Sequence, residues 1–164
     1  MTGNILQINI SRGGIPKLSI SECFLGPLGI EGDAHARPQF HGGPRQAVLL
    51  ISSEAIADLT ACGYPVFPGA LGENLTTRGI DRRHMRAGQR YRVGEAVIEL
   101  TKVRTPCTTL DIYGPSIKKE IYDSQVKAGD PASPRWAMSG FYASIVRSGN
   151  IRQNDIIVLV DQVV

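Results

Sequence analysis

The sequence predicts a mainly β protein with inserted helices, of the β/α+β class, folded as a closed or partly open β-barrel. About seven or eight short segments have the composition of strands, whereas only two have the spacing of helices. The helical segments do not alternate regularly with the strands, as a parallel α/β sheet would require. The 18 glycines and 10 prolines are scattered along the 164 residues, which is typical of short strands joined by tight turns.

The first strands are predicted near the N-terminus. Residues 4–10 alternate and place Leu6, Ile8 and Ile10 on one face, which favours a half-buried strand. Residues 17–25 form a second strand segment, which the glycines and the proline that follow it bring to an end.

The first helix is predicted directly after a strand at residues 46–51. Ser52 or Ser53 is suited to cap this helix, because a hydroxyl can accept a hydrogen bond from the first free N–H groups. Ile56 and Leu59 are three residues apart and would form the inner face of the helix.

The second half of the chain is predicted to complete the barrel. Residues 89–93 and 96–103 form a hairpin around the two-residue turn Gly94-Glu95. A second helix is expected over residues 115–127, where proline is suited to the first turn. Two closing strands follow, at residues 141–146 and 156–160.

Length and composition favour a single domain over residues 1–164. The three cysteines are odd in number and form no CxxC pair, so they indicate free thiols in a reducing compartment. Cys23 and Cys62 are expected to be packing residues. No apolar run approaches ~20 residues and no signal peptide is recognisable, so we expect a cytoplasmic location without membrane contact. The net charge of only +3 gives no indication of nucleic-acid binding.

Arginine supplies most of the positive charge. Six arginines fall within fifteen positions, and the planar guanidinium suits phosphate and carboxylate groups. A solvated basic surface is the alternative. The six are Arg78, Arg82, Arg83, Arg86, Arg90 and Arg92.

Two glycine-rich loops interrupt the strands, at residues 32–45 and 68–75. Such loops let backbone N–H groups approach an anion, but neither matches a nucleotide-binding motif. The first loop also contains Asp33, His35 and His41, whose spacing matches no dedicated zinc or iron site. A long loop without regular structure commonly has a function, so we expect a binding site here.

A short stretch after the hairpin carries the candidate reactive group, Cys107. Pro106 stops the preceding strand, because proline cannot donate to a strand ladder. Arg104 lies three residues before Cys107, and a nearby guanidinium favours the thiolate, the form that attacks electrophiles or binds soft metals. An inert, buried cysteine is the alternative, and a hydrolytic triad is disfavoured because no hydrolase elbow motif is present. We expect this stretch and the two glycine-rich loops to converge on one cleft.

Several segments, taken together and in order, resemble the MOSC domain, the module named for the C-terminal domain of molybdenum-cofactor sulfurase. The resemblance spans roughly residues 4–161 and is strongest to the short, stand-alone bacterial members. The segments are Gly32–His35, His41–Val48, Pro68–Thr76, Arg104–Cys107, Gly140–Val146 and Gly149–Ile151.

This resemblance implies a β-barrel-like fold that binds the molybdenum cofactor in its molybdopterin form. The family's cysteine matches Cys107, which would be the molybdenum ligand and the catalytic residue. In characterised relatives the activity is the reduction of N-hydroxylated compounds, such as hydroxylamines and amidoximes. The residues that match the family's cofactor site are His41, Asn74 and Arg104, with Ser11 and Arg45 as weaker matches.

Two departures from longer family members affect the expected function. The sequence lacks the desulfurase domain of full sulfurases, so it would not make a persulfide from cysteine alone. It also lacks the extra N-terminal β-domain and any iron–sulfur module, so a separate redox protein would supply the electrons for a small-molecule substrate. Two alternatives stay open: a sulfur or cofactor carrier that uses a Cys107 persulfide, and a non-catalytic module that binds another anion.

Overall fold

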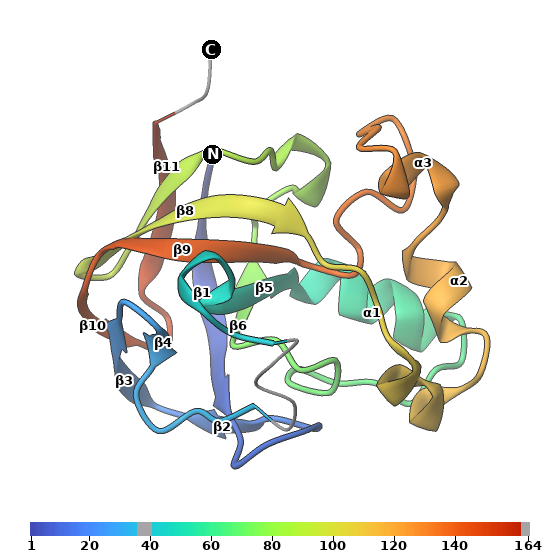
Figure 1. The fold of residues 1–164 in the computed structure, drawn as a ribbon, viewed down its shortest axis with the longest axis horizontal. Helices are drawn as coiled ribbons and strands as arrows, with labels where there is room; N and C mark the ends of the chain where they lie inside the picture. The colour runs from blue at the N-terminus through green and yellow to red at the C-terminus, as the bar shows by residue number, and fades with distance from the viewer. Residues whose placement is uncertain (36–40, 162–164) are drawn as a thin grey trace.

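Seven strands form a closed barrel in the computed structural model, which describes residues 1–35 and 41–161 (Figure 1). Around the barrel the order is β11-β7-β8-β9-β5-β6-β1, and a pairing between β11 and β1 closes the ring. The mainly β barrel predicted from the sequence is therefore confirmed. The strands are β1 (Thr2–Ile10), β2 (Leu18–Ile20), β3 (Glu22–Gly26), β4 (Gly29–Ile30), β5 (Val48–Ser52), β6 (Leu75–Arg78), β7 (Arg90–Val93), β8 (Ala96–Val103), β9 (Phe141–Arg147), β10 (Gly149–Arg152) and β11 (Ile156–Asp161).

Neighbouring strands of the barrel are antiparallel, except that β5 and β6 run parallel with Leu50 opposite Leu75. A parallel pair needs a crossover connection, and helix α1 with the loop after it provides that connection. This crossover contains the second glycine-rich loop, which returns to the barrel just before β6.

The strand expected over residues 17–25 is in fact two strands in two different sheets. β2 pairs with β1 in the barrel, whereas β3 pairs with β10 and β4 in a small separate sheet. The chain changes sheet at Ser21. The residues of β2 and β3 have the same strand-like composition, so the sequence alone could not show that the two segments pair with different strands.

Strand β1 also departs from the simple alternation expected of it. Ile5 and Ile8 are fully buried, whereas Leu6 and Ile10 are only partly buried. The register between β1 and β6 shifts between Ile5 and Gln7. An extra residue in one strand moves the side chains that follow it to the other face, which explains why Ile5 replaces Leu6 in the core.

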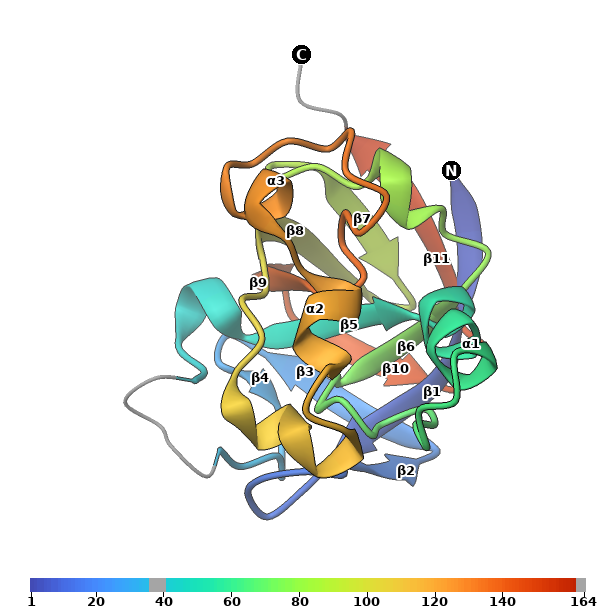
Figure 2. The ribbon, with the colours of Figure 1, turned by 90° about the vertical axis from the view of Figure 1, so that its right-hand side faces the viewer.

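The helices gather at one end of the barrel, which faces the viewer in Figure 2. Helix α1 begins as expected, because Ser52 Oγ accepts a hydrogen bond from the N–H of Ala55 at 3.1 Å. Ile56 and Leu59 are both buried, as their spacing predicts. The helices are α1 (Ser53–Ala61), α2 (Ile117–Ile121) and α3 (Ser124–Lys127), with 3-10 helices at Pro44–Gln46, Arg82–His84 and Thr108–Tyr113.

The single helix expected over residues 115–127 is divided into α2 and α3. Tyr122 has an extended backbone, with φ −155° and ψ 139°, and so interrupts the helix. Asp123 then caps α3 by accepting a hydrogen bond from the N–H of Val126 at 2.8 Å. Aspartate is more favourable at such a cap than inside a helix, which explains the break.

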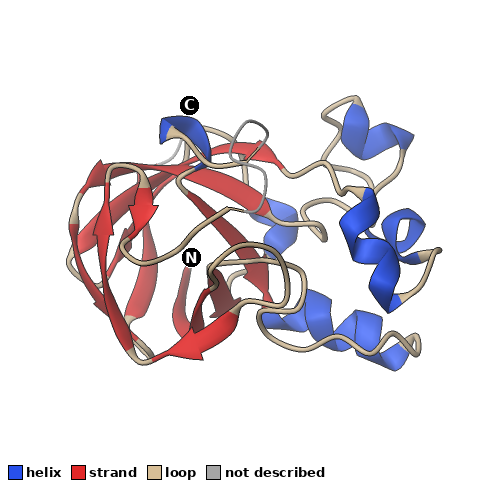
Figure 3. Ribbon diagram, turned by 60° about the horizontal axis from the view of Figure 1, so that its bottom comes forward, coloured by secondary structure: helices blue, strands red, loops and turns tan. Residues whose placement is uncertain are grey.

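Two groups of buried apolar side chains meet at β5. One fills the barrel and includes Leu50 and Phe141, and the other packs under the helices and includes Leu49 and Leu59. Figure 3 shows the barrel and the helices as two adjoining parts of the molecule. Strand β5 is therefore buried on both faces, between the two groups. None of the described helices is long and apolar enough to span a membrane.

Candidate functional site

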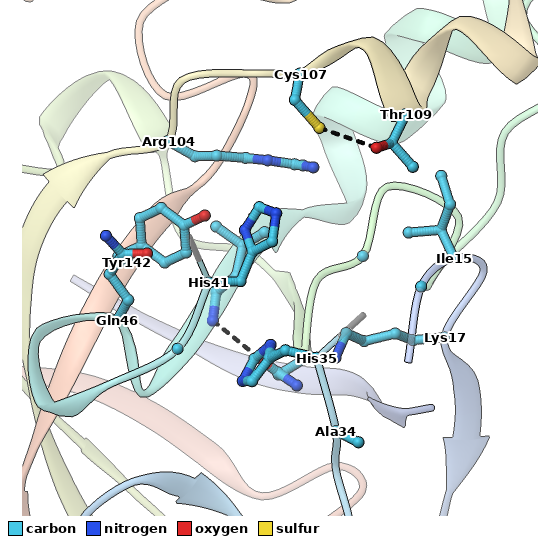
Figure 4. A pocket seen from close by; sticks show the side chains of 15 residues that line it. Ile15, Lys17, Ala34, His35, His41, Gln46, Arg104, Cys107, Thr109 and Tyr142 are labelled. Atoms are coloured by element: carbon cyan, nitrogen blue, oxygen red, sulfur yellow. Dashed lines mark hydrogen bonds between the residues drawn. The ribbon is translucent and has the colours of Figure 1, made fainter. Parts of the chain in front are cut away.

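A cavity of about 110 Å³ lies beside the end of β8, and the described parts of three loops line it (Figure 4). The two glycine-rich loops and the stretch after β8 meet there, as the sequence predicts. The first loop contributes Ala34, His35, His41 and Gly42, the second contributes Gly72 and Asn74, and the third contributes Arg104, Cys107 and Thr109.

Cys107 lies in the loop that follows β8, directly after Pro106. Its Sγ donates a hydrogen bond to Thr109 Oγ1 at 3.2 Å. The residue is partly buried, and Figure 4 shows its sulfur facing the hollow that Arg104 and His41 also face. A core cysteine would have no open space beside its sulfur, so this position suits a reactive or metal-binding thiol.

Arg104 is buried at this strand end, with 7% of its surface exposed. Its Nη1 donates a hydrogen bond to the carbonyl oxygen of Leu71 at 2.7 Å. A guanidinium has five N–H donors, and the described residues accept only this one side-chain hydrogen bond. The other donors are therefore left for a ligand in the cavity that Arg104 lines.

Asn74 belongs to a buried polar network under the cavity. Its Nδ2 donates to Asp33 Oδ2 at 2.8 Å, and its Oδ1 accepts from the N–H of Leu49 at 3.1 Å. Lys17 Nζ lies 2.7 Å from both carboxylate oxygens of Asp33, and the side chains of this pair are 8% and 5% exposed. Asn74 therefore connects the first loop to β5 and fixes the shape of the cavity.

Ser11 and Arg45, the two weaker candidates, are not among the described residues that line the cavity. The N–H of Ser11 donates to Asp33 Oδ1 at 3.0 Å, and its Oγ donates to the carbonyl of Gly14 at 2.9 Å. Arg45 is exposed, and its carbonyl accepts a hydrogen bond from Thr101. Ser11 supports the site through Asp33, whereas nothing in the structure connects the Arg45 side chain to the cavity.

Both described histidines of the first loop line the cavity. A Cβ on Gly42 would lie 2.8 Å from the ring of His35, so this glycine permits close contact with the imidazole. Burial, followed by the ammonium of Lys17, lowers the pKa of His35. His35 is therefore neutral at pH 7, and can accept as well as donate a hydrogen bond.

Sequence reasoning missed several residues of the site, among them Lys17, Gln46 and Tyr142. Tyr142 projects from β9 beside the cavity, where burial and then Cys107 raise the pKa of its hydroxyl, while Arg104 lowers it. The hydroxyl therefore stays protonated at neutral pH. The alternation of β9 could have placed Tyr142 opposite the buried face of Phe141, but not next to Cys107.

The six clustered arginines do not line the cavity. Arg82 donates to backbone carbonyls near Trp136, and Arg86 lies 5.7 Å from the centre of the Trp136 ring. Arg83 pairs with Asp81, and Arg90 pairs with Glu99. The interpretation of this cluster as a site for phosphate or carboxylate groups is therefore not supported at the cavity.

The other two cysteines differ from each other. Cys23 is partly buried in β3, and burial raises the pKa of its thiol to about 11, so it is an unreactive packing residue as expected. Cys62 is exposed at the end of α1, so its expected packing role is wrong.

Among the described residues, no group of three or more His, Cys, Asp or Glu side chains could hold a metal ion.

Glu73 is a fully buried carboxyl in the second loop. Its Oε1 accepts hydrogen bonds from the N–H of Gly69 and from Thr76 Oγ1, and its Oε2 has no hydrogen-bond partner among the described residues. Burial raises its pKa from 4.5 to about 7, although the guanidinium of Arg104 acts in the opposite direction. This carboxyl is therefore protonated in a substantial part of the molecules at neutral pH.

Comparison with curated proteins identifies relatives that are longer than this chain. It is 35% identical to Protein YiiM of Escherichia coli over 106 residues, 60% of this chain and 46% of that protein. It is 35% identical to the uncharacterized protein YflK of Bacillus subtilis over 144 residues, 87% and 60% of the two chains. A protein named reductase from Gibberella moniliformis is 27% identical over 147 residues, 85% of this chain and 24% of that protein. The chain spans less than two thirds of the length of each relative.

Solved structures share the fold. The crystal structure of YiiM from Geobacillus stearothermophilus aligns with 97% of this chain and 75% of that chain, with a TM-score of 0.74 and 24% identity. The YUAD protein of Bacillus subtilis aligns over 99% and 98%, with a TM-score of 0.71 and 21% identity. A family model for the MOSC domain matches residues 37–158. Because that model spans most of the chain, the protein belongs to the MOSC-domain family, which is associated with binding of the molybdenum cofactor.

Proposed function

We propose that the cavity beside Cys107 binds the molybdopterin form of the molybdenum cofactor, with Cys107 as the metal ligand. The observation that carries the proposal is that the sulfur of Cys107 and the guanidinium of Arg104 face one cavity. Molybdenum held by dithiolene sulfurs favours a further soft thiolate, and a pterin phosphate favours a guanidinium. The donors around the cavity therefore fit both ends of this cofactor.

Two cations line the cavity, and Arg104 is the one suited to the anionic end of the cofactor. It has N–H donors that no described residue accepts, whereas the charge of Lys17 is largely balanced by Asp33. No carboxylate lines the cavity in the part of the chain that the structure describes, so no like charge there opposes a phosphate. Asn74 acts as a positioning residue, because its side chain is occupied by Asp33 and the backbone of β5.

The proposed activity is the reduction of N-hydroxylated small molecules, such as hydroxylamines and amidoximes. Cleavage of the N–O bond consumes two electrons and two protons, R–NH–OH + 2e⁻ + 2H⁺ → R–NH₂ + H₂O. The bound cofactor supplies the electrons, and a separate redox protein replenishes them. In this proposal Tyr142, which lines the cavity and keeps its proton at neutral pH, donates one of the two protons.

A sulfur or cofactor carrier is the second candidate, because Cys107 also lines a groove on the outer side of the cavity. In that case Cys107 would hold a labile persulfide and the protein would contain little molybdenum. A non-catalytic module that binds another anion would contain neither a persulfide nor molybdenum.

The test is elemental analysis and turnover of protein produced in a host that makes the cofactor. The reductase predicts about one molybdenum per chain and turnover of a hydroxylamine when a reducing partner is supplied. Protein that contains labile sulfur but no molybdenum would contradict the reductase and support the sulfur carrier. If the protein contains molybdenum but reduces no N-hydroxylated compound, the proposed cofactor binding would be supported and the proposed activity would be contradicted.

A further inference from the structure

A second hollow, of about 320 Å³, adjoins the cavity. We call the two the inner cavity and the outer groove, because buried Arg104 and Asn74 line only the first, while exposed Lys102 and Thr105 line only the second. The two share a wall that includes Cys107. A molecule in the outer groove would therefore reach the proposed metal ligand without entering the part of the inner cavity lined by Arg104. The shared residues are His41, Gln46, Cys107, Thr109 and Tyr142.

Lys102 is held over this groove by a cross-strand contact. Its Cα is paired with that of Tyr142 in the β8–β9 ladder, so the two side chains share a face. The ammonium lies 5.9 Å from the centre of the Tyr142 ring. The face of the Tyr142 ring attracts the ammonium, which favours a position of the charge at the groove.

The charge of Lys102 has no counterion within the described residues. No described carboxylate forms an ion pair with Lys102, whereas Arg90 on the adjacent strand is paired with Glu99 at 2.7 Å. None of the described residues that line the outer groove is acidic. The groove therefore offers a positive charge flanked by the neutral polar groups of Gln46 and Thr105.

We propose that the outer groove is the substrate subsite, and that Lys102 selects N-hydroxylated substrates that carry an anionic group, a carboxylate or a phosphate. This inference rests on the proposed reductase, because the groove is assigned to substrate once the inner cavity is assigned to cofactor. A single ammonium recognises either anion as a point charge, so the group itself is left to the experiment. Lys102 would contribute to substrate binding and would not touch the N–O bond.

The experiment uses cofactor-loaded protein and three matched amidoximes: 4-carboxybenzamidoxime, its neutral methyl ester, and 4-(phosphonooxy)benzamidoxime. Binding is measured by calorimetry without an electron donor, and kcat/KM is measured with one. We expect the wild type to prefer an anionic compound over the ester by about tenfold. Lys102→Gln should bring the ratio to about one, and Lys102→Glu should reverse it.

The matched control is Lys127→Gln, a change at an exposed lysine of α3 that lines neither hollow. This variant should retain both the activity and the preference of the wild type. Equal binding of the ester and both anions by the wild type would overturn the inference, as would a preference that survives Lys102→Gln. Failure to reduce any of the three compounds would contradict the reductase instead, while the binding ratios would still decide the role of Lys102.

Discussion

The guanidinium of Arg104 donates a 2.7 Å hydrogen bond to the carbonyl oxygen of Leu71. The backbone of Arg104 is held at the same time, because its N–H donates to Gly140 at 2.9 Å and its carbonyl accepts from Ser139 at 2.6 Å. This one residue therefore joins the end of β8 to the loop that contains Asn74. These hydrogen bonds hold Arg104 in one position, from which it would contact the anionic cofactor that we propose.

Replacement of this residue should affect both cofactor retention and stability. In Arg104→Ala the cofactor should be held at least about tenfold more weakly, because hydrogen bonds to charged groups are worth roughly 1.5–3 kcal/mol. Loss of the partner of Leu71 should also lower the free energy of unfolding by about 1–3 kcal/mol. Molybdenum per chain after gel filtration and urea unfolding measure the two effects. Arg45→Ala is the control, and unchanged retention in Arg104→Ala would remove Arg104 from the site.

The second prediction concerns the stability that the buried ion pair of Lys17 and Asp33 contributes. Asp33→Asn leaves the Lys17 ammonium buried without its counterion, which should lower the free energy of unfolding by about 3 kcal/mol. The double variant Lys17→Met with Asp33→Asn removes the isolated charge and should recover part of this loss. Urea unfolding at neutral pH compares the variants. A loss in Asp33→Asn below about 1 kcal/mol would show that the pair is not buried in solution.

Glu73 predicts a pH dependence of stability. Its pKa is raised from 4.5 to about 7, so between these values the folded protein keeps a proton that the unfolded chain has released. The contribution of Glu73 is therefore greatest below pH 4.5 and is lost as pH rises through about 7. Glu73→Gln keeps a carbonyl oxygen to accept from the N–H of Gly69 but has no proton to release. Its melting temperature relative to wild type should rise from about pH 5 to about pH 8, and parallel melting curves across this range would count against a raised pKa.

The parts of the fold that local chemistry determines could be predicted from the sequence. The hairpin of β7 and β8 turns at Gly94, with Val93 paired to Ala96, because glycine there takes a positive φ of 55°. Ser52 caps helix α1 because its hydroxyl can accept a hydrogen bond from a free N–H of the first turn. Cys107 lies in the loop after β8, because Pro106 prevents the strand from continuing to it.

What depends on distant partners could not be predicted. Lys17 and Asp33 form their ion pair only because β1, β2 and the first loop meet at one end of the barrel. Tyr142 reaches Cys107 only through the pairing of β8 with β9. The sequence pattern shows that a residue is charged or aromatic, but the register and the bulges decide which cavity it faces.

The last prediction concerns Cys107, whose sulfur must ionise to ligate molybdenum. Cys107→Ser keeps the size but offers a harder and less acidic donor, and Cys107→Ala removes the donor. Both variants should fold, because a partly buried loop side chain contributes little packing, and both should lose bound molybdenum and reduction of a hydroxylamine. Cys62→Ser, which changes an exposed thiol away from the cavity, should keep both properties and controls for general thiol damage. Full activity in Cys107→Ala would defeat the proposed mechanism, because no other described cysteine lines the cavity to replace it.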